Sequence, residues 1–175
     1  QNGLFRVKTK YIIGCDGPFS VVSRWLDNEL HMDSFALQYE LPLAQSLSET
    51  LVYFEPEYFG GYGWVFPKGM TANVGIGVHY SHRTKVTGLL RTFAAGLKKK
   101  GIVVSAEPIR ITSGWIPGRG LNRNLTDGKL LLAGDAAGCT HPITGAGILN
   151  AVVSGRIAAQ VIIEHFDDES EMIIG

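Results

Sequence analysis

The sequence predicts an α+β fold in which an antiparallel-sheet domain is flanked by two pieces of an α/β domain. Two apolar runs, residues 11–13 and 130–133, end abruptly at turns that carry Asp16 and Asp135, as strands of an α/β domain do. Between them lie short runs of β-forming residues separated by turns, which favour an antiparallel sheet. We therefore expect three segments, 1–32, 33–117 and 118–175, with the two outer segments forming one domain.

The first segment contains an extended stretch that we expect to end as a buried strand at residues 11–13. The turn Gly14-Cys15-Asp16-Gly17 and a short helix follow this strand. A carboxylate thus stands at a strand end, beside a helix start. Because Asp-Gly turns are common in proteins, this arrangement alone is a weak indication of a binding site.

The middle segment changes to short strands, expected at residues 35–43, 50–54, 61–66 and 73–80. Residues 85–100 have apolar side chains at helical spacing, and Gly101 follows as a stop signal, so they predict one amphipathic helix. Residues 102–116 are expected to return to extended structure. Short connections between the strands make this segment an antiparallel substrate domain.

The third segment contains the longest run of motif residues in the chain. The apolar run 130–133 stops at Gly134 and Asp135, and a loop with Pro142 leads to Gly145, Ala146 and Gly147. This glycine-rich triplet opens an apolar helix, whose first N–H groups and positive dipole end suit a phosphate. The alternative is a buried strand that leads into a core helix, with Asp135 as an ordinary cap.

An aromatic run in the middle segment predicts a second site. Tyr62, Trp64 and Phe66 fall on one face of a strand at period two, with Pro67 next, and they are expected to line an apolar slot. The alternative is that they form the core of the sheet. The glycines beside them, together with the polar edges of Trp and Tyr, favour a ligand wall.

Composition excludes several classes of protein. The 175 residues include 16 basic and 16 acidic side chains, and this zero net charge gives no sign of nucleic-acid binding. The two cysteines lie in different motifs, so we expect a reducing compartment, the cytoplasm, without disulfides. Four of the five histidines, His31, His79, His82 and His165, are too scattered to argue a metal site. No apolar run is long enough to cross a membrane, which leaves peripheral membrane contact open, and no oligomeric state is predicted.

The motif from Gly134 to Gly147 resembles the second flavin-contacting motif of FAD-dependent oxidoreductases related to para-hydroxybenzoate hydroxylase. The resemblance implies that Asp135 binds the ribityl chain of FAD and that the Gly145–Gly147 helix start lies by the pyrophosphate and the isoalloxazine. Asp16 and Gly17 match a second motif of the group, which implies a further contact with FAD and, in hydroxylases, with a nicotinamide cofactor. Ser23 stands where that motif usually has arginine, which puts the nicotinamide contact in doubt.

The aromatic run resembles a motif of the geranylgeranyl reductase family within this group. Tyr62, Trp64, Phe66 and Pro67 match it, whereas Phe59 replaces its leading proline. The resemblance implies an FAD-dependent oxidoreductase that reduces carbon–carbon double bonds of an isoprenoid or lipid substrate, with NADPH or a ferredoxin-type protein as electron donor. In that family the aromatic motif sits over the flavin and shapes a tunnel for the isoprenoid.

Members of this family also carry a Gly-x-Gly-x-x-Gly fingerprint in a first dinucleotide-binding unit, and the sequence contains no such fingerprint. We therefore expect the chain to be a fragment that holds an incomplete FAD site and is inactive by itself. His141 is a candidate acid, or a loop histidine satisfied by backbone groups, and Cys139 is a proton donor or a small spacer. Two other functions remain open: an FAD-dependent aromatic monooxygenase or halogenase-like enzyme, and a non-catalytic hydrophobe-binding domain.

Overall fold

The computed structural model describes residues 6–29, 31–166 and 172–173. The chain divides into two compact units, an outer unit of residues 1–31 and 117–175 and a middle unit of residues 32–116. These limits lie within one residue of the expected divisions at 32/33 and 117/118. The mixed α/β composition with an antiparallel sheet confirms the predicted fold class.

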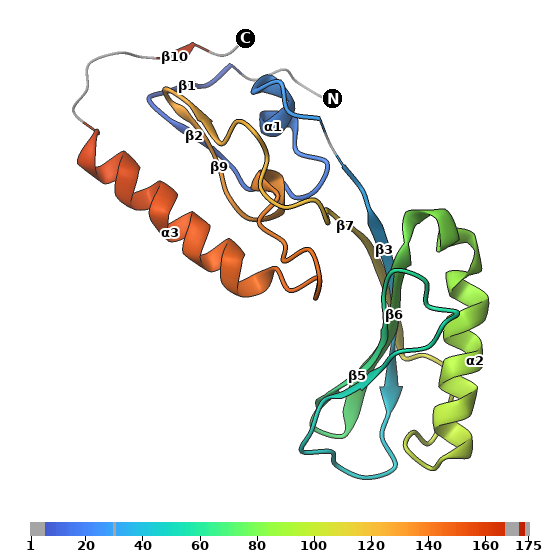
Figure 1. Cartoon of the computed structure of the whole chain (residues 1–175). Helices are drawn as coiled ribbons and strands as arrows, with labels where there is room; N and C mark the ends of the chain where they lie inside the picture. The colour runs from blue at the N-terminus through green and yellow to red at the C-terminus, as the bar shows by residue number, and fades with distance from the viewer. Residues whose placement is uncertain (1–5, 30, 167–171, 174–175) are drawn as a thin grey trace. The chain divides into compact units, whose positions relative to one another are not determined.

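The middle unit consists of a five-stranded antiparallel sheet with one long helix along it (Figure 1). In chain order its elements are β3 (Ser34–Pro42), β4 (Leu51–Tyr53), β5 (Gly63–Lys68), β6 (Thr71–His79), the 3₁₀ helix η1 (Tyr80–Lys85), α2 (Val86–Lys99) and β7 (Arg110–Ile116). The strand order in the sheet is β4-β5-β6-β3-β7. The predicted helix at 85–100 is therefore confirmed to within one residue at each end.

Alternation along the strands gives this sheet two different faces. Side chains at every second position of β6, among them Val74, Ile76 and Val78, are fully buried. They form one core with Leu90 and Leu97 of α2, because helix and sheet each present an apolar stripe to the other. The side chains on the second face do not belong to this core, and we call that second surface the open face.

One prediction for the middle segment is wrong. Residues 102–116 were expected to be extended throughout, but the strand β7 begins only at Arg110. Before it the backbone runs through turns and bends, and Val103 makes a single isolated bridge to Leu43. The Val103 side chain is almost fully buried in the core. Val103, with Ile102 and Ala106 beside it, thus reflects packing against the core rather than strand pairing.

The outer unit is built around a short parallel pair of strands. Its elements are β1 (Lys8–Thr9), β2 (Ile12–Gly14), α1 (Val21–Trp25), β8 (Thr126–Asp127), β9 (Leu130–Leu132), the 3₁₀ helix η2 (Gly134–Ala137), α3 (Ile148–Glu164) and β10 (Met172–Ile173). Strand β9 lies between β2, to which it is parallel, and β8, to which it is antiparallel. A second pair joins β1 to β10.

The predicted buried strand at residues 11–13 is only partly correct. Strand β2 starts at Ile12, and Ile13 is exposed, whereas all three residues of β9 are buried. The difference arises because, among the described residues, β2 pairs with a strand on one side only, while β9 has neighbours on both sides. Central strands bury both faces more completely than edge strands do.

Helix α3 starts where the glycine triplet predicts it, at Ile148, and it presents a largely apolar surface. Ile148 and Leu149 are 85% and 73% exposed, and Ala158 is its only buried residue among those described. The helix runs past β9 and η2 and contacts both (Figure 1). Among the described residues, no helix combines the length and the apolarity that a membrane span requires.

Candidate functional site: a flavin-type loop and an aromatic row

The two candidate carboxylates follow neighbouring parallel strands. Gly14 and Leu132 are partners in the register of β2 and β9, and the Ala133 N–H donates to the Gly14 carbonyl at 3.0 Å. Because the carboxyl ends of parallel strands meet at one edge, Asp16 and Asp135 both leave the sheet at that edge. This is the place where open α/β sheets bind their ligands.

Asp135 lies in a small group of residues from both sides of the loop. The Thr140 hydroxyl, itself buried, donates to Asp135 Oδ1 at 2.6 Å. A Cβ atom added at Gly147 would lie 3.3 Å from the same oxygen and 3.4 Å from the Thr140 hydroxyl. Glycine at 147 therefore keeps space beside the carboxylate that any other residue would occupy.

Glycines also set the path of the loop before Asp135 and after it. Gly134 has φ +61° and donates its N–H to the Ser154 hydroxyl of α3 at 3.0 Å. Gly138 has φ +73°, and a Cβ there would lie 2.3 Å from the Gly120 carbonyl oxygen. No residue with a side chain fits at Gly138 without moving backbone, so η2 and the turn that follows it are fixed in shape.

The start of α3 has the properties of an anion site. Its first residue follows Gly147, which provides no side-chain cap, and the residues around it are exposed. The first N–H groups of such a helix lack intrahelical partners and lie at the positive end of its dipole. Together with the Asp135 group, this arrangement fits the ribityl and phosphate parts of FAD.

His141 organises its own loop. Its Nδ1 accepts hydrogen bonds from the N–H groups of Ile143 and Thr144, both at 3.3 Å. Two donors at Nδ1 place the proton of the neutral ring on Nε2. At Nδ1 the ring is thus a loop histidine held by backbone groups, as one of the two sequence-based alternatives has it. At Nε2 it can still donate a proton, as the other alternative requires.

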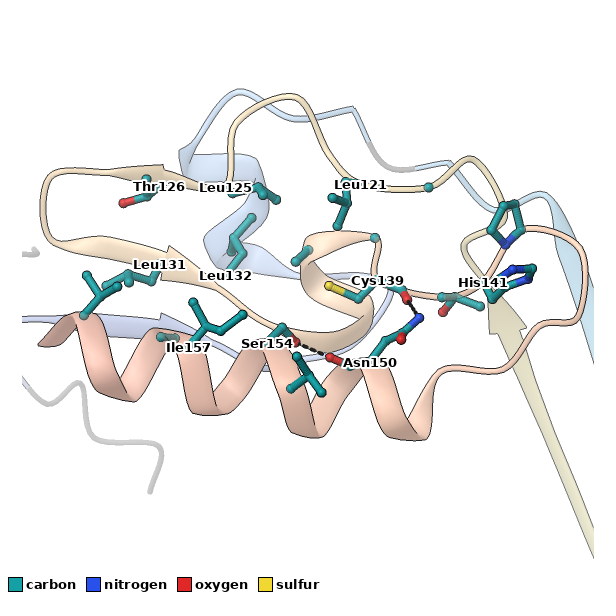
Figure 2. A pocket seen from close by; sticks show the side chains of 18 residues that line it. Leu121, Leu125, Thr126, Leu131, Leu132, Cys139, His141, Asn150, Ser154 and Ile157 are labelled. Atoms are coloured by element: carbon teal, nitrogen blue, oxygen red, sulfur yellow. Dashed lines mark hydrogen bonds between the residues drawn. The ribbon is translucent and has the colours of Figure 1, made fainter.

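Cys139 is half-buried, and its backbone ties the loop to α3. The Asn150 side-chain amide donates to the Cys139 carbonyl at 2.7 Å, and the Ser154 hydroxyl donates to the Asn150 carbonyl at 2.7 Å (Figure 2). Both cysteines of the chain are free thiols. The contacts of Cys139 are those of a small packing residue, which supports the spacer role.

A cavity of about 610 Å³ lies between α3 on one side and strands β8 and β9 with the loop of residues 137–142 on the other. Cys139 and His141 are among its lining residues (Figure 2). Most of its wall is aliphatic, from Leu121, Leu131 and Ile157. None of the described residues that line it is acidic, and Asp135 is not one of them. The loop therefore presents the Asp135 group and this apolar cavity as separate environments.

Asp16 caps the helix that follows it. Its Oδ1 accepts from the Ser20 hydroxyl at 2.6 Å and its Oδ2 from the Val21 N–H at 2.7 Å. Burial raises the pKa of Asp16, but these hydrogen bonds outweigh it and hold the pKa below the ordinary value of an aspartate. The carboxylate stabilises the turn before α1, and its contact with FAD stays a prediction.

This geometry predicts a pH dependence of stability. Because the folded pKa of Asp16 is lowered, its stabilising contribution is present above the unfolded pKa of about 4 and is lost as the pH falls through the folded value. Asp16→Asn should therefore flatten the acid side of a curve of unfolding free energy against pH. Denaturant titrations at a series of pH values measure this, and Asp127→Asn on the exposed strand β8 is the control. An unchanged curve in Asp16→Asn would contradict the assignment.

The aromatic run lies on the open face of the middle unit. The ring centroids of Tyr62 and Trp64 are 5.8 Å apart, and those of Trp64 and Phe66 are 5.7 Å apart. None of the three belongs to the buried core that α2 covers, and Phe66 is 39% exposed. Burial raises the pKa of the Tyr62 hydroxyl. The three rings form a continuous row, which we call the aromatic row, and Pro67 follows it in β5.

Sequence reasoning missed several residues that hold the site together. Asn122 donates through its amide to the Ser23 hydroxyl and the Ala136 carbonyl, at 2.9 and 2.8 Å, and so joins its own turn to α1 and to η2. Thr140 and Ser154 also fix the loop: the Thr140 hydroxyl donates to Asp135, and the Ser154 hydroxyl accepts from the Gly134 N–H. The only sequence signal for Asn122 is the polar character of the turn at residues 119–123.

Among the described residues, no cluster of His, Cys, Asp or Glu is arranged to bind a metal.

The parallel strand pair, the carboxylate at its edge and the glycine-lined helix start define a flavoprotein-type dinucleotide-binding domain. A family model described as "FAD binding domain" matches residues 1–167, and the chain belongs to this family of FAD-binding domains. FAD is the cofactor of the family.

Particular relatives narrow this class. "Digeranylgeranylglycerophospholipid reductase 3" of Methanosphaera stadtmanae is 34% identical in an alignment of 165 positions that covers 89% of this chain and 41% of that protein. "Digeranylgeranylglycerophospholipid reductase" of Methanocaldococcus jannaschii is 36% identical over 167 residues, with the same coverage of 89% and 41%. The predicted resemblance to the geranylgeranyl reductases is thus confirmed, and the chain spans about two fifths of the length of these relatives.

Solved structures agree with this relationship. A geranylgeranyl bacteriochlorophyll reductase-like protein from Thermoplasma acidophilum matches with a TM-score of 0.80 and 34% identity, over 91% of this chain and 42% of that one. The flavin-dependent halogenase CmlS matches with a TM-score of 0.62 and 23% identity, over 91% of this chain and 32% of that one. The second likeness shows the shared fold alone.

Proposed function

We propose that this chain supplies flavin- and substrate-binding parts of an oxidoreductase that reduces carbon–carbon double bonds of geranylgeranyl-type isoprenoid chains. The observation that carries the proposal is the aromatic row, because three rings in contact on a sheet face outside the core form a wall for an apolar ligand. The similarity to digeranylgeranylglycerophospholipid reductases supports the same substrate class.

Each group of residues has a distinct task in this proposal. Asp135, with Gly134 beside it and Thr140 bonded to it, would hold ribityl hydroxyls, and the segment Pro142 to Gly147 would hold the phosphate and ring portions of FAD. When bound, FAD supplies the hydride that a carbon–carbon double bond requires. Tyr62, Trp64, Phe66 and Pro67 hold the alkene and exclude water from it.

The second hydrogen of the reduced bond arrives as a proton. Within this chain His141 is the proposed donor, because its Nδ1 is occupied by two N–H groups and its Nε2 carries the proton, which solvent water at this exposed residue would return. Cys139 is assigned the spacer role. NADPH or a ferredoxin-type protein is the proposed electron donor, and peripheral contact with a membrane would deliver a lipid substrate.

The test is a chimera in which this chain replaces the aligned segment of the Methanocaldococcus jannaschii relative. Reduced anaerobically and supplied with a geranylgeranyl lipid, the chimera should add one hydrogen pair per double bond, measured by mass spectrometry. A chimera that binds FAD and the lipid but adds no hydrogen would contradict the reductase function.

The same preparation separates the two alternatives. An aromatic monooxygenase or halogenase-like enzyme would consume oxygen with an aromatic substrate and leave the geranylgeranyl lipid unchanged. A non-catalytic hydrophobe-binding domain would bind the lipid without any spectral response to added FAD. No observation on the chain itself favours either alternative over the reductase.

The isolated chain is expected to retain FAD poorly. Its sequence has no Gly-x-Gly-x-x-Gly fingerprint, so the contacts described above serve only part of the cofactor. Absorbance of the purified chain in the flavin band should show far less than one FAD per chain, and the chimera should show close to one. Stoichiometric FAD on the isolated chain would contradict this prediction.

A further inference from the structure

The open face has an unusual distribution of side-chain size. Beside the row that contains Trp64, Gln38 and Thr112, the register aligns Gly77, Ala36 and Gly114 across three adjacent strands. Two of the three residues in this second row are glycines, so the only side chain in it is the methyl group of Ala36. We call these three residues the bare strip.

Trp64 lies flat across the neighbouring strand. Its register partner on β6 is Gly75, and a Cβ atom there would be 2.3 Å from Cζ2 and 2.5 Å from Cε2 of the indole. At Gly77 a Cβ would still lie 3.6 Å from Cζ3. The ring thus covers Gly75, reaches the edge of the bare strip and forms a wall beside it.

A hydrogen-bond chain fixes the indole in this position. Trp64 Nε1–H donates to Gln38 Oε1 at 3.3 Å, and Gln38 Nε2 donates to the Thr112 hydroxyl at 3.0 Å. Because the indole can only donate, it determines which end of the Gln38 amide faces it, and the amide nitrogen must face Thr112. The chain crosses from β5 over β3 to β7.

The space beside this chain is suited to an apolar ligand. A cavity of about 160 Å³ is lined by Ala36, Gln38, Trp64, Thr112, Ser113 and Gly114, none of which is charged. A Cβ added at Gly114 would meet nothing within 4 Å. Side chains on one face of a strand are two residues, or about 6.8 Å, apart. A row without side chains across the strands therefore leaves a groove wide enough for one hydrocarbon chain.

We propose that Gln38 is a positioning residue that holds the Trp64 indole flat on Gly75, and that the bare strip beside it binds the methyl-branched chain of an isoprenoid. The proposal rests on the proposed function for the class of ligand. It adds a path for that ligand across β6, β3 and β7, and it adds residues outside the aromatic row. The ring supplies a wide apolar surface at little entropic cost, provided that its orientation is held.

The test measures binding of geranylgeraniol to the full 175-residue chain. Trp25→Phe and Trp115→Phe leave Trp64 as the only indole, so its fluorescence reports both its orientation and the bound chain. Gly114→Leu fills the strip and should weaken binding about tenfold or more, as expected when an apolar contact surface of this size is lost. Gly88→Leu adds the same side chain in open space on α2 and should leave binding unchanged.

Two substitutions at Gln38 distinguish a role in positioning the Trp64 indole from a general effect on the stability of the fold. Gln38→Met removes the acceptor for the indole N–H and should shift Trp64 emission and weaken binding about tenfold. Gln38→Glu keeps an oxygen acceptor at the same place, now of a carboxylate, and should restore both. Thermal unfolding verifies that each variant is folded. Equal binding by Gly114→Leu and the parent chain, or no rescue by Gln38→Glu, would overturn the proposal.

The outcomes also separate this proposal from the proposed function. If geranylgeraniol binds as expected but the chimera adds no hydrogen to its lipid, the strip stands and the reductase assignment fails. If the chimera reduces the lipid and the strip variants behave like the parent, the strip is wrong and the reductase assignment stands. Absence of geranylgeraniol binding to the parent chain would overturn the strip in either case.

Discussion

Replacing Asp135 by alanine is expected to lower the affinity of the chimera for FAD by about 10- to 100-fold. Hydrogen bonds to a charged group contribute about 1.5–3 kcal/mol each, and about 1.4 kcal/mol corresponds to one factor of ten in affinity. Asp135 is the carboxylate at the carboxyl end of the central strand β9, and Gly147 keeps space open beside it. Quenching of flavin fluorescence during titration measures the change.

Loss of the carboxylate also affects the protein itself, so this prediction needs a second variant. Asp135→Ala leaves the buried Thr140 hydroxyl without its acceptor, at a cost of about 1–3 kcal/mol in stability. Thr140→Val removes the hydroxyl and keeps the shape of the side chain. If Thr140→Val alone weakens FAD binding as much as Asp135→Ala does, loop order rather than the carboxylate governs affinity. Asp127→Ala, on the exposed strand β8, should have no effect.

Replacing Gly61 by alanine is expected to destabilise the middle unit by about 3 kcal/mol. The added Cβ would lie 2.0 Å from the carbonyl oxygen of Gly77 and 2.5 Å from its carbonyl carbon. The atoms in the way are backbone of β6, which is hydrogen-bonded to strands on both sides and cannot move without breaking the sheet. Thermal unfolding should show a lower Tm, by about 6–12 °C for a chain of this size.

Gly88→Ala is the matched control for this change. A Cβ at Gly88 would meet nothing within 4 Å, and the residue lies within α2. Alanine there should stabilise the protein by up to about 1 kcal/mol, because glycine is the poorer helix former. Equal stability of Gly61→Ala and the parent chain would show that the segment before β5 can move away from β6.

Sequence patterns predicted the elements well where one physical requirement acted alone. Runs of β-forming residues between turns marked β3, β5 and β6, and helical spacing with Gly101 as a stop marked α2 within one residue. The motif from Gly134 to Gly147 predicted the strand end, the loop and the start of α3, because glycines are required there by positive φ and by close backbone approach.

Patterns failed where apolar residues served packing rather than pairing. Residues 102–116 are expected to be extended, yet in 102–109 only Val103 makes a bridge, to Leu43, while its side chain fills the core of the middle unit. Ile12 and Ile13 looked like a strand buried on both faces, yet β2 pairs with only one strand among the described residues. A run of apolar side chains does not specify which neighbour covers it.

The sequence by itself determined the family and its cofactor, and it predicted the residues of the two parts of the site, because a long motif of glycine, aspartate and aromatic residues at fixed offsets is far more specific than any of its short pieces. Only the tertiary structure decided how those residues work. It showed that Thr140 and Gly147 meet at Asp135, that Asn122 joins its own turn to α1 and η2, and that Gln38 reaches Trp64. These contacts join different loops, strands and helices, and local periodicity carries no information about such partners until the elements are placed together.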